Sequence, residues 1–294
     1  MAPGGVNATK SCAIAWETEQ AMELMKGVHA PMTRTGHSSA FDPDSGCLHI
    51  FGGAKKKRFF SDIHTLEIAT NTWTSVKPTG GGVAPTCSYH SMNFHRGELF
   101  VFGGVYPEPD PTPDTCSNTL HIFSFAQKNW YKPSIVGDMP CARSGHSATL
   151  VEDELVIFGG WDMPAVFNDV FVMDMTLLEC AKLDGLGGTA PHLRSWHAAT
   201  MLPIAGTRCV LVHGGFDGEE VMGDAHVLDL DNKKWVDVSA TIGLSARAGH
   251  TAVVSDDGLS VLFFGGGDNE GTFFNEVTSV STANIAAAIA SDCE

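Results

Sequence analysis

The fold of this chain is decided by a pattern that is clearest in residues 143–169, which read RSGHSATLVEDELVIFGGWDMPAVFND. Arg143 precedes His146 by three residues, and two short apolar runs follow, the second of which ends in Gly159-Gly160. Asp169 stands nine residues after the second glycine and opens a further apolar run. Short runs rich in β-branched and aromatic residues and closed by glycine are typical of buried strands. The stretch therefore predicts three successive β-strands.

The pattern recurs along the whole chain. Five Gly-Gly pairs close apolar runs, and their first glycines are 51, 56, 55 and 51 residues apart, at Gly52, Gly103, Gly159, Gly214 and Gly265. Each pair is preceded by a histidine, at His37, His90, His146, His197 and His250. Four units carry the arginine, at Arg34, Arg143, Arg194 and Arg247, and Cys87 takes its place in the second unit. A period of about 50 residues indicates repeats of one supersecondary unit.

The end of each unit predicts a fourth strand. An aspartate or asparagine follows the glycine pair, at Asp62, Asn118, Asp169, Asp224 and Asn275. Three units then place a tryptophan further on, at Trp73, Trp130 and Trp235, and Cys180 stands there in the third. A tryptophan offers a large apolar face for a neighbouring unit. We expect four strands per unit, lettered a to d, in repeats at about 34–86, 87–142, 143–193, 194–246 and 247–281.

These residues resemble the kelch repeat, whose fold is a β-propeller. The resemblance implies an all-β, kelch-type propeller in one domain over residues 1–294. The five repeats predict five four-stranded blades, fewer than the six or seven expected from the family. The fifth repeat lacks a strand d, and residues 12–18, which include Trp16, are expected to supply it and so close the ring. Closure of this kind removes exposed strand edges. Residues 282–294 are expected to form a tail or a short helix. Within the family, the first repeat looks like that of kelch-repeat effectors of a late-endosomal Rab GTPase.

Composition narrows the possible partners. Lys and Arg number 18 against 34 Asp and Glu, which gives a formal net charge of −16. Such a chain repels phosphate backbones, so nucleic acid is not an expected partner. No apolar run reaches the roughly 20 residues of a membrane helix, and residues 1–10 do not read as a signal peptide. The eight cysteines form no CxxC pair. We expect reduced thiols, a cytoplasmic location and no direct membrane insertion.

The loops between strands b and c are the segments in which the repeats differ most, and binding usually resides in such loops. The first of them is basic, with Lys55, Lys56, Lys57 and Arg58 in an otherwise acidic protein. Each of the five carries an aromatic residue; the candidates for partner contact are Phe59, Tyr106, Trp161, Phe216 and Phe273. Exposed aromatic residues are common anchors of interfaces. The alternative is that the basic cluster is a solvated loop, and that Phe60, Phe167 and Phe274 pack inward.

Two sets of repeat residues allow either a structural or a binding role. Arg34, Arg143, Arg194 and Arg247 are expected at the channel mouth, where they either bind an anion or pair with nearby Asp side chains and carbonyl groups. The structural pairing is favoured, because the arginines belong to the repeat itself. The five repeat histidines could in principle surround a metal ion, but local hydrogen bonds explain them equally well. We expect no metal and no cofactor.

The sequence favours a binding protein over an enzyme. Specifier proteins share the propeller fold and carry an iron-binding E-x-x-x-D-x-x-x-H pattern; here Glu220 and Asp224 begin it, but Leu228 stands in place of the histidine. No G-x-S-x-G motif is present. We expect a non-catalytic scaffold that binds a protein, such as a small GTPase or a cytoskeletal protein, through the loops of the bc and da face. The alternatives are a substrate-recognition module of a ubiquitin ligase and a small-molecule enzyme of the specifier kind.

Overall fold

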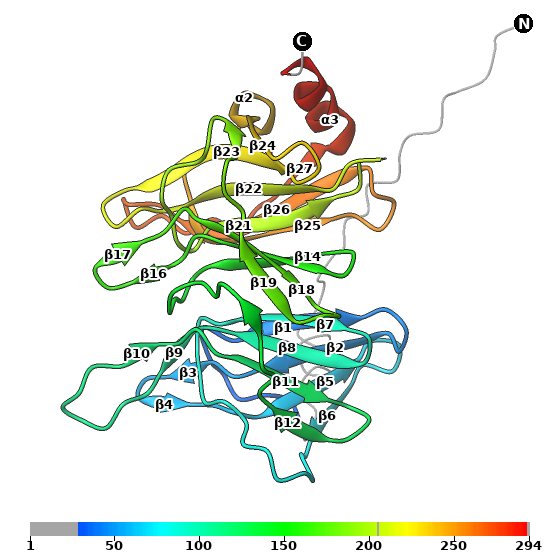
Figure 1. Cartoon of the computed structure of the whole chain (residues 1–294), viewed down its shortest axis with the longest axis vertical. Coiled ribbons are helices and arrows are strands. Elements are labelled where there is room, and N and C mark those ends of the chain that lie inside the picture. Colours follow the sequence, from blue (N-terminus) through cyan, green and yellow to red (C-terminus); the bar gives the residue numbers. More distant parts are fainter. Residues whose placement is uncertain (1–28, 205, 293–294) are drawn as a thin grey trace, which may run out of the picture.

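The computed structural model describes residues 29–204 and 206–292, and β-strands make up almost all of its regular structure. Five antiparallel sheets follow one another along the chain, one for each repeat, in a five-bladed β-propeller arrangement (Figure 1). Within each blade the main strands are neighbours in the order in which they occur in the sequence. The predicted all-β propeller fold is confirmed.

Blades 1 to 4 each contain four main strands. Blade 1 consists of β1 (Ser38–Asp42), β2 (Cys47–Phe51), β5 (Ile63–Glu67) and β6 (Thr72–Val76). Blade 2 consists of β7 (Ser91–His95), β8 (Glu98–Phe102), β11 (Leu120–Ser124) and β12 (Asn129–Tyr131). Blade 3 consists of β14 (Ser147–Val151), β15 (Glu154–Phe158), β18 (Val170–Asp174) and β19 (Glu179–Lys182). Blade 4 consists of β21 (Ala198–Leu202), β22 (Cys209–Phe216), β23 (Val221–Asp229) and β24 (Lys234–Asp237).

Blade 5 has three strands in the described part of the chain, β25 (Ala248–Val254), β26 (Ser260–Gly267) and β27 (Val277–Ser281). Helix α3 (Thr282–Ser291) begins directly after β27, where the other blades continue to a fourth strand. Ile285 and Ile289 of α3 are buried in the same core cluster as Phe263 of β26, so the helix is packed onto the blades. The fourth strand expected from residues 12–18 lies outside the described residues.

The core consists of apolar layers between neighbouring blades. Strand β8 reads ELFVF, and its last four side chains are all buried because both faces of the strand are covered. Phe100 and Ile122 of blade 2, for example, pack in one cluster with Leu155 and Met173 of blade 3. A propeller strand that is covered on both faces needs a continuous apolar run, which explains the runs before each glycine pair.

Four junctions between blades share one set of contacts. The residue before the glycine pair faces the repeat histidine of the next blade, with ring centroids 4.9–5.4 Å apart, in the pairs Phe51–His90, Phe102–His146, Phe158–His197 and His213–His250. The first glycine has a positive φ, and a Cβ atom there would lie within 3.0 Å of that histidine ring. The N–H of the second glycine donates to a backbone carbonyl of the next blade, at 2.8–3.0 Å. Glycine is therefore required where the blades meet.

The junction from blade 5 to blade 1 differs from the other four. Phe264 occupies the position of Phe51, Phe102 and Phe158, but it is 52% exposed, whereas those three are at most 1% exposed. The space beside Gly265 contains no histidine ring. His37, which would face Phe264 by analogy, is exposed. Within the described chain, the contacts that join the other blades are not formed between blade 5 and blade 1.

Short additional elements complete the arrangement. β13 (Val136–Gly137) and β20 (Gly187–Gly188) add parallel strands at the outer edges of blades 3 and 4, beside β19 and β24. Helix α2 (Ser239–Ile242) follows β24 and lies near α3 at the top of Figure 1. In the described part of the chain, no helix is long and apolar enough to cross a membrane.

Candidate protein-interaction face

The bc segments are β-hairpins that lie on one side of the molecule, at the left of Figure 1. Three of them are separate two-stranded sheets: β3 (Ala54–Lys55) with β4 (Arg58–Phe59), β9 (Val105–Tyr106) with β10 (Thr115–Cys116), and β16 (Trp161–Asp162) with β17 (Ala165–Val166). In blade 4 the hairpin is an extension of β22 and β23 themselves. We call this side of the molecule the loop face.

The repeat arginines anchor these hairpins from beneath. Arg143 and Arg194 are 0% exposed, and each donates to both oxygens of an aspartate, Asp169 at 2.6 and 3.1 Å and Asp224 at 2.9 and 2.8 Å. Arg34 pairs in the same way with Asp62, whereas Arg247 donates to one oxygen of Glu276, at 3.2 Å. Each guanidinium also donates to the carbonyl of the first glycine of the pair. Three of them lie over the ring of a phenylalanine, Phe60, Phe167 or Phe274.

These contacts occupy the four arginines. Burial alone would raise the pKa of Asp62, but hydrogen bonds and charge from Arg34 and His64 lower it to about 2. The pKa of Asp224 is held well below its usual range by His226 and Arg194, against the effect of burial. The geometry supports the structural alternative for the arginines over an anion site. Because Asp224 is engaged by Arg194 and His226, it is also not free to act as a ligand in the pattern that begins at Glu220.

Four aromatic residues lie on the loop face: three of them are in ring contact, and the fourth lines the same cavity as two of these. Trp161 lies at the start of the blade 3 hairpin, Phe216 at that of blade 4, and Trp196 directly after the Arg194-Ser195 pair. The ring centroids of Trp161 and Trp196 are 5.5 Å apart, and those of Trp196 and Phe216 are 6.0 Å apart in a stacked arrangement. Tyr89 is the fourth member and is 43% exposed. We call these four residues the aromatic cluster.

Tyr89 and Trp196 have left-handed backbone conformations. They occupy the position before the repeat histidine, where the other three repeats have Gly36, Gly145 and Gly249, and all five residues have φ between 49° and 72°. A chain of backbone hydrogen bonds of 2.7–3.1 Å links them in order from Gly36 to Gly249, one residue per blade. A left-handed conformation costs an ordinary residue roughly 1–2 kcal/mol. Two large aromatic side chains are thus held rigidly in a conformation that glycine adopts more easily.

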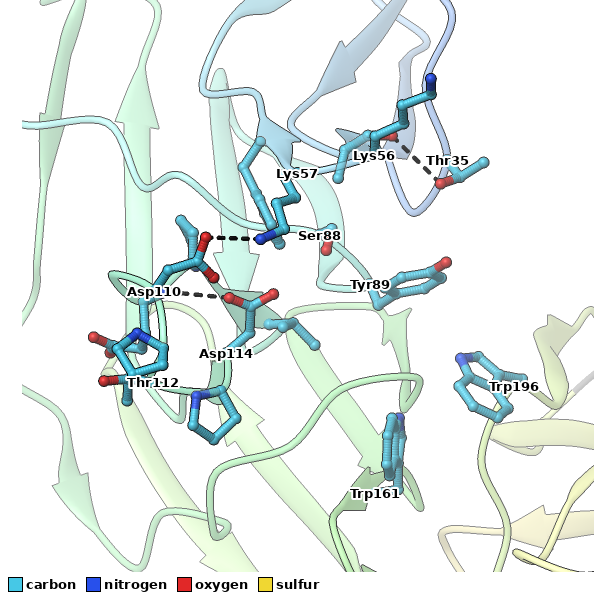
Figure 2. Close-up of a pocket in the computed structure, with 17 residues that line it drawn as sticks. Thr35, Lys56, Lys57, Ser88, Tyr89, Asp110, Thr112, Asp114, Trp161 and Trp196 are labelled. Carbon is cyan, nitrogen blue, oxygen red and sulfur yellow. Dashed lines mark hydrogen bonds and ion pairs between the residues drawn. The ribbon is translucent and has the colours of Figure 1, made fainter.

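A cavity of about 660 Å³ opens between the aromatic cluster and the hairpins of blades 1 and 2. Figure 2 shows the rings of Tyr89, Trp161 and Trp196 on one side of it, and Lys57, Asp110 and Asp114 on the other. Lys57 and Asp110 are joined by an ion pair of 2.7 Å, and both side chains are more than 80% exposed. An ion pair this exposed contributes little to stability and can be exchanged for a pair with a partner.

The remaining candidate residues differ in their exposure to solvent. Lys55, Lys56 and Arg58 are exposed and Phe59 is half-buried, in the blade 1 hairpin. Phe273 is 85% exposed at the edge of the loop face. Tyr106 instead turns inward, where its ring lies against His121 and its hydroxyl is 3.5 Å from His121 Nδ1. The half-buried Tyr106 packs against the core cluster that includes Cys87, and burial raises the pKa of its hydroxyl.

Tyr89 and Trp196 are not among the residues expected from the sequence to bind a partner. The signal was present, because a position that is glycine in three repeats carries a large aromatic residue in the other two.

Four of the five repeat histidines, His90, His146, His197 and His250, lie between neighbouring blades, whereas His37 is exposed. Burial lowers the pKa of His90 and of His146 to about 3, so both are neutral at ordinary pH. His146 and His197 each place Nε2 within 2.9 Å of a serine hydroxyl of the preceding blade. Among residues 29–204 and 206–292, no three His, Cys, Asp or Glu side chains are grouped so that they could hold a metal ion.

The repeated junctions and the anchored hairpins define a kelch-repeat β-propeller with an aromatic loop face. The chain belongs to the family described as FBX42, beta-propeller domain, whose family model matches residues 34–235.

Several curated proteins are similar in sequence to this chain. Acyl-CoA-binding domain-containing protein 4 of Arabidopsis thaliana is 29% identical over 86% of this chain and 38% of its own length. Acyl-CoA-binding domain-containing protein 5 of the same organism is 30% identical over 82% of this chain and 37% of its own length. Rab9 effector protein with kelch motifs of Mus musculus is 28% identical over 66% of this chain and 50% of its own length. The chain therefore spans half or less of these relatives.

A solved structure, that of YjhT, aligns with a TM-score of 0.64 and covers 84% of this chain and 81% of YjhT. Its sequence identity is 18%, so the likeness concerns the fold.

Proposed function

We propose that this chain is a non-catalytic scaffold that binds a protein partner through the loop face. The observation that carries the proposal is the pair of strained aromatic residues, Tyr89 and Trp196, at positions where three other repeats have glycine. Strained backbone persists where the surrounding structure enforces it, and it gathers at functional sites. Here it presents two rings on a rigid frame, which lowers the entropic cost of binding.

A small GTPase is the partner class that the relatives favour. Rab9 effector proteins with kelch motifs match this chain at 28% identity in the mouse, rat and cattle proteins. The mixed charge around the cavity, basic on the blade 1 hairpin and acidic at Asp110 and Asp114, suits a polar protein surface. The ubiquitin-ligase module and the specifier-type enzyme stay as alternatives to the scaffold. We also propose a cytoplasmic location.

Affinity capture with three proteins tests the proposal. The parent is compared with a loop-face variant (Lys55, Lys56, Lys57 and Arg58 to Ser, with Trp161→Ala) and with a control, Asp44→Asn, Glu152→Gln and Asp256→Asn. The three control residues are exposed in ab turns, at the ends of the strands away from the bc hairpins. The lysate is supplemented with a non-hydrolysable GTP analogue, and captured proteins are identified by mass spectrometry.

The parent and the control should capture the same partner, a GTPase in its GTP form, and the loop-face variant should lose it. Capture by all three proteins would show that the loop face is not the binding surface. Capture of a specific partner that is not a GTPase would keep the scaffold and reject the partner class.

A further inference from the structure

A second hollow of the loop face lies beside the first and differs from it in chemistry. It is a crevice of about 330 Å³ between the hairpins of blades 3 and 4. Trp161, Val166, Trp196 and Phe216 are among the residues that line it, with Met163 and Pro164 from the tip of the blade 3 hairpin. Trp161 and Trp196 belong to both hollows, so one ligand could reach from the cavity into the crevice.

The walls of the crevice offer few accessible groups for a polar ligand group to bind, because the unpartnered indole N–H groups of Trp161 and Trp196 are buried. The Ser195 hydroxyl already donates to the Phe216 carbonyl at 3.2 Å. The backbones of these two residues also bond to each other in both directions, at 2.8 Å. Burial of a polar group without a partner is unfavourable, so the crevice selects an apolar side chain. Met163 is 76% exposed beside the opening, and its flexible side chain can adapt to the shape of a ligand.

The surroundings of the crevice are acidic. Asp162 follows Trp161, and Asp217, Glu219 and Glu220 follow Phe216, while neither hairpin contains a Lys or Arg. The backbone N–H groups of Glu220 and Glu219 donate to Asp217 and lower its pKa, so this carboxylate is charged at neutral pH. The cations on the adjoining elements do not cancel this charge: Arg194 is buried in its pair with Asp224, and His192 lies 3.8 Å from Asp217 as a group that is charged only when protonated. An apolar hollow with a negative rim complements an apolar side chain flanked by positive charge.

We propose that the crevice binds a partner segment that inserts Leu, Met or Phe between Trp161 and Phe216 and places Lys or Arg next to it. The inference rests on the proposed function and specifies the chemistry of the partner at this part of the loop face. The side chain buries apolar surface against the aromatic cluster, and the adjacent cation meets Asp162, Asp217, Glu219 or Glu220. Because these carboxylates are exposed or half-exposed, their contribution is screened by salt.

Selection from a library of random nonapeptides, displayed on phage and presented to the purified chain, tests the proposal without a known partner. We expect the enriched peptides to carry Leu, Met or Phe with Lys or Arg within two positions. One enriched peptide, synthesised with a fluorescent label, is then titrated against the parent by fluorescence polarisation at low and high salt.

Two variants and a control make the titration decisive. Met163→Glu changes an exposed residue, so folding is not at risk, and it should weaken binding at least tenfold by placing a charge at the apolar opening. Asp217→Asn with Glu219→Gln and Glu220→Gln should weaken binding about fivefold at 50 mM salt and little at 500 mM. The control Asp44→Asn, Glu152→Gln and Asp256→Asn removes the same formal charge away from the loop face and should leave the affinity unchanged.

Enrichment of acidic or wholly polar peptides would overturn the inference, as would no enrichment, or equal affinity for the parent and Met163→Glu. These failures are distinct from failure of the proposed function, because capture of a native partner through the loop face does not require this peptide chemistry.

Discussion

At the scale of single residues, the position before each repeat histidine has a backbone conformation that the fold requires and, in two repeats, a side chain that we propose to bind the partner. Glycine at Gly36, Gly145 and Gly249 meets the demand for a positive φ at little cost. Tyr89 and Trp196 meet the same demand with strain and cover a neighbouring glycine: a Cβ on Gly36 would lie 3.1 Å from the Tyr89 ring, and one on Gly145 would lie 2.9 Å from the Trp196 ring. The fold requires the backbone conformation, and the aromatic ring is an addition to it.

Trp196→Gly should therefore remove binding without unfolding the protein. Relief of strain is worth roughly 1–2 kcal/mol, and the greater freedom of glycine in the unfolded chain offsets about half of it. We expect the free energy of unfolding in urea to change by less than about 1 kcal/mol, because the lost ring packing opposes the remaining gain. Capture of the partner should fall at least tenfold. A large loss of stability would show that the indole holds the blades together, and unchanged capture would remove Trp196 from the binding surface.

At the scale of elements, each blade is fastened at two places. The strand b glycine pair and the histidine of the next blade meet between the blades, and the arginine ties the bc hairpin to the start of strand c. The histidines in these contacts are buried and neutral, because burial lowers the pKa of His90 and of His146 to about 3. The junctions therefore depend on pH.

Acidification should destabilise the junctions before it affects the arginine pairs. The folded-state pKa of these histidines lies below the unfolded value of about 6.5, so their contribution is present above that pH and is lost as the pH falls toward 3. For Asp62, whose folded pKa is about 2, the loss comes only below about pH 4. Each histidine should give a slope of about 1.4 kcal/mol per pH unit in the free energy of unfolding between pH 6 and 4.

Urea unfolding at a series of pH values measures this slope. His90→Phe keeps a ring at the junction and removes the titrating group. It should reduce the slope by about 1.4 kcal/mol per pH unit, which corresponds to one proton. An equal slope in the parent and in His90→Phe would contradict the assignment, as would a parent whose stability is constant from pH 7 to 4.

At the scale of the whole molecule, four junctions between neighbouring blades share the same contacts, and the junction between blade 5 and blade 1 differs from them. Trp130 of blade 2 packs on Phe51 of blade 1 at 4.9 Å between ring centroids, and Trp235 of blade 4 packs on Phe158 of blade 3 at 5.2 Å. By the same pattern Trp73 of blade 1 would pack on Phe264 of blade 5, yet Phe264 is half-exposed. Closure of the ring by residues 12–18 stays a prediction.

Alanine substitutions at equivalent positions compare the junctions directly. Phe102→Ala, at a fully buried site, should lower the free energy of unfolding by about 3–5 kcal/mol. Phe264→Ala should lower it by less than about 1 kcal/mol, because roughly half of the side chain is already in water. Urea unfolding of the two variants beside the parent measures both values. Equal losses would show that Phe264 is covered in solution, as closure of the ring by residues 12–18 predicts.

The sequence alone determined the repeats, the order of strands and the number of blades, because these depend on patterns within about 50 residues: apolar runs, the glycine pair, and the arginine and histidine ahead of it. It also indicated that Phe60, Phe167 and Phe274 could pack inward, and they lie under the arginines.

Only the tertiary structure decided how distant segments meet. Tyr106 turns inward, while Tyr89 faces the cavity. Arg194 pairs with Asp224, thirty residues away in the sequence. Trp161, Trp196 and Phe216 line one crevice between two blades. The physical reason is that side-chain exposure and pairing depend on neighbours from other blades, whose identity no local pattern contains.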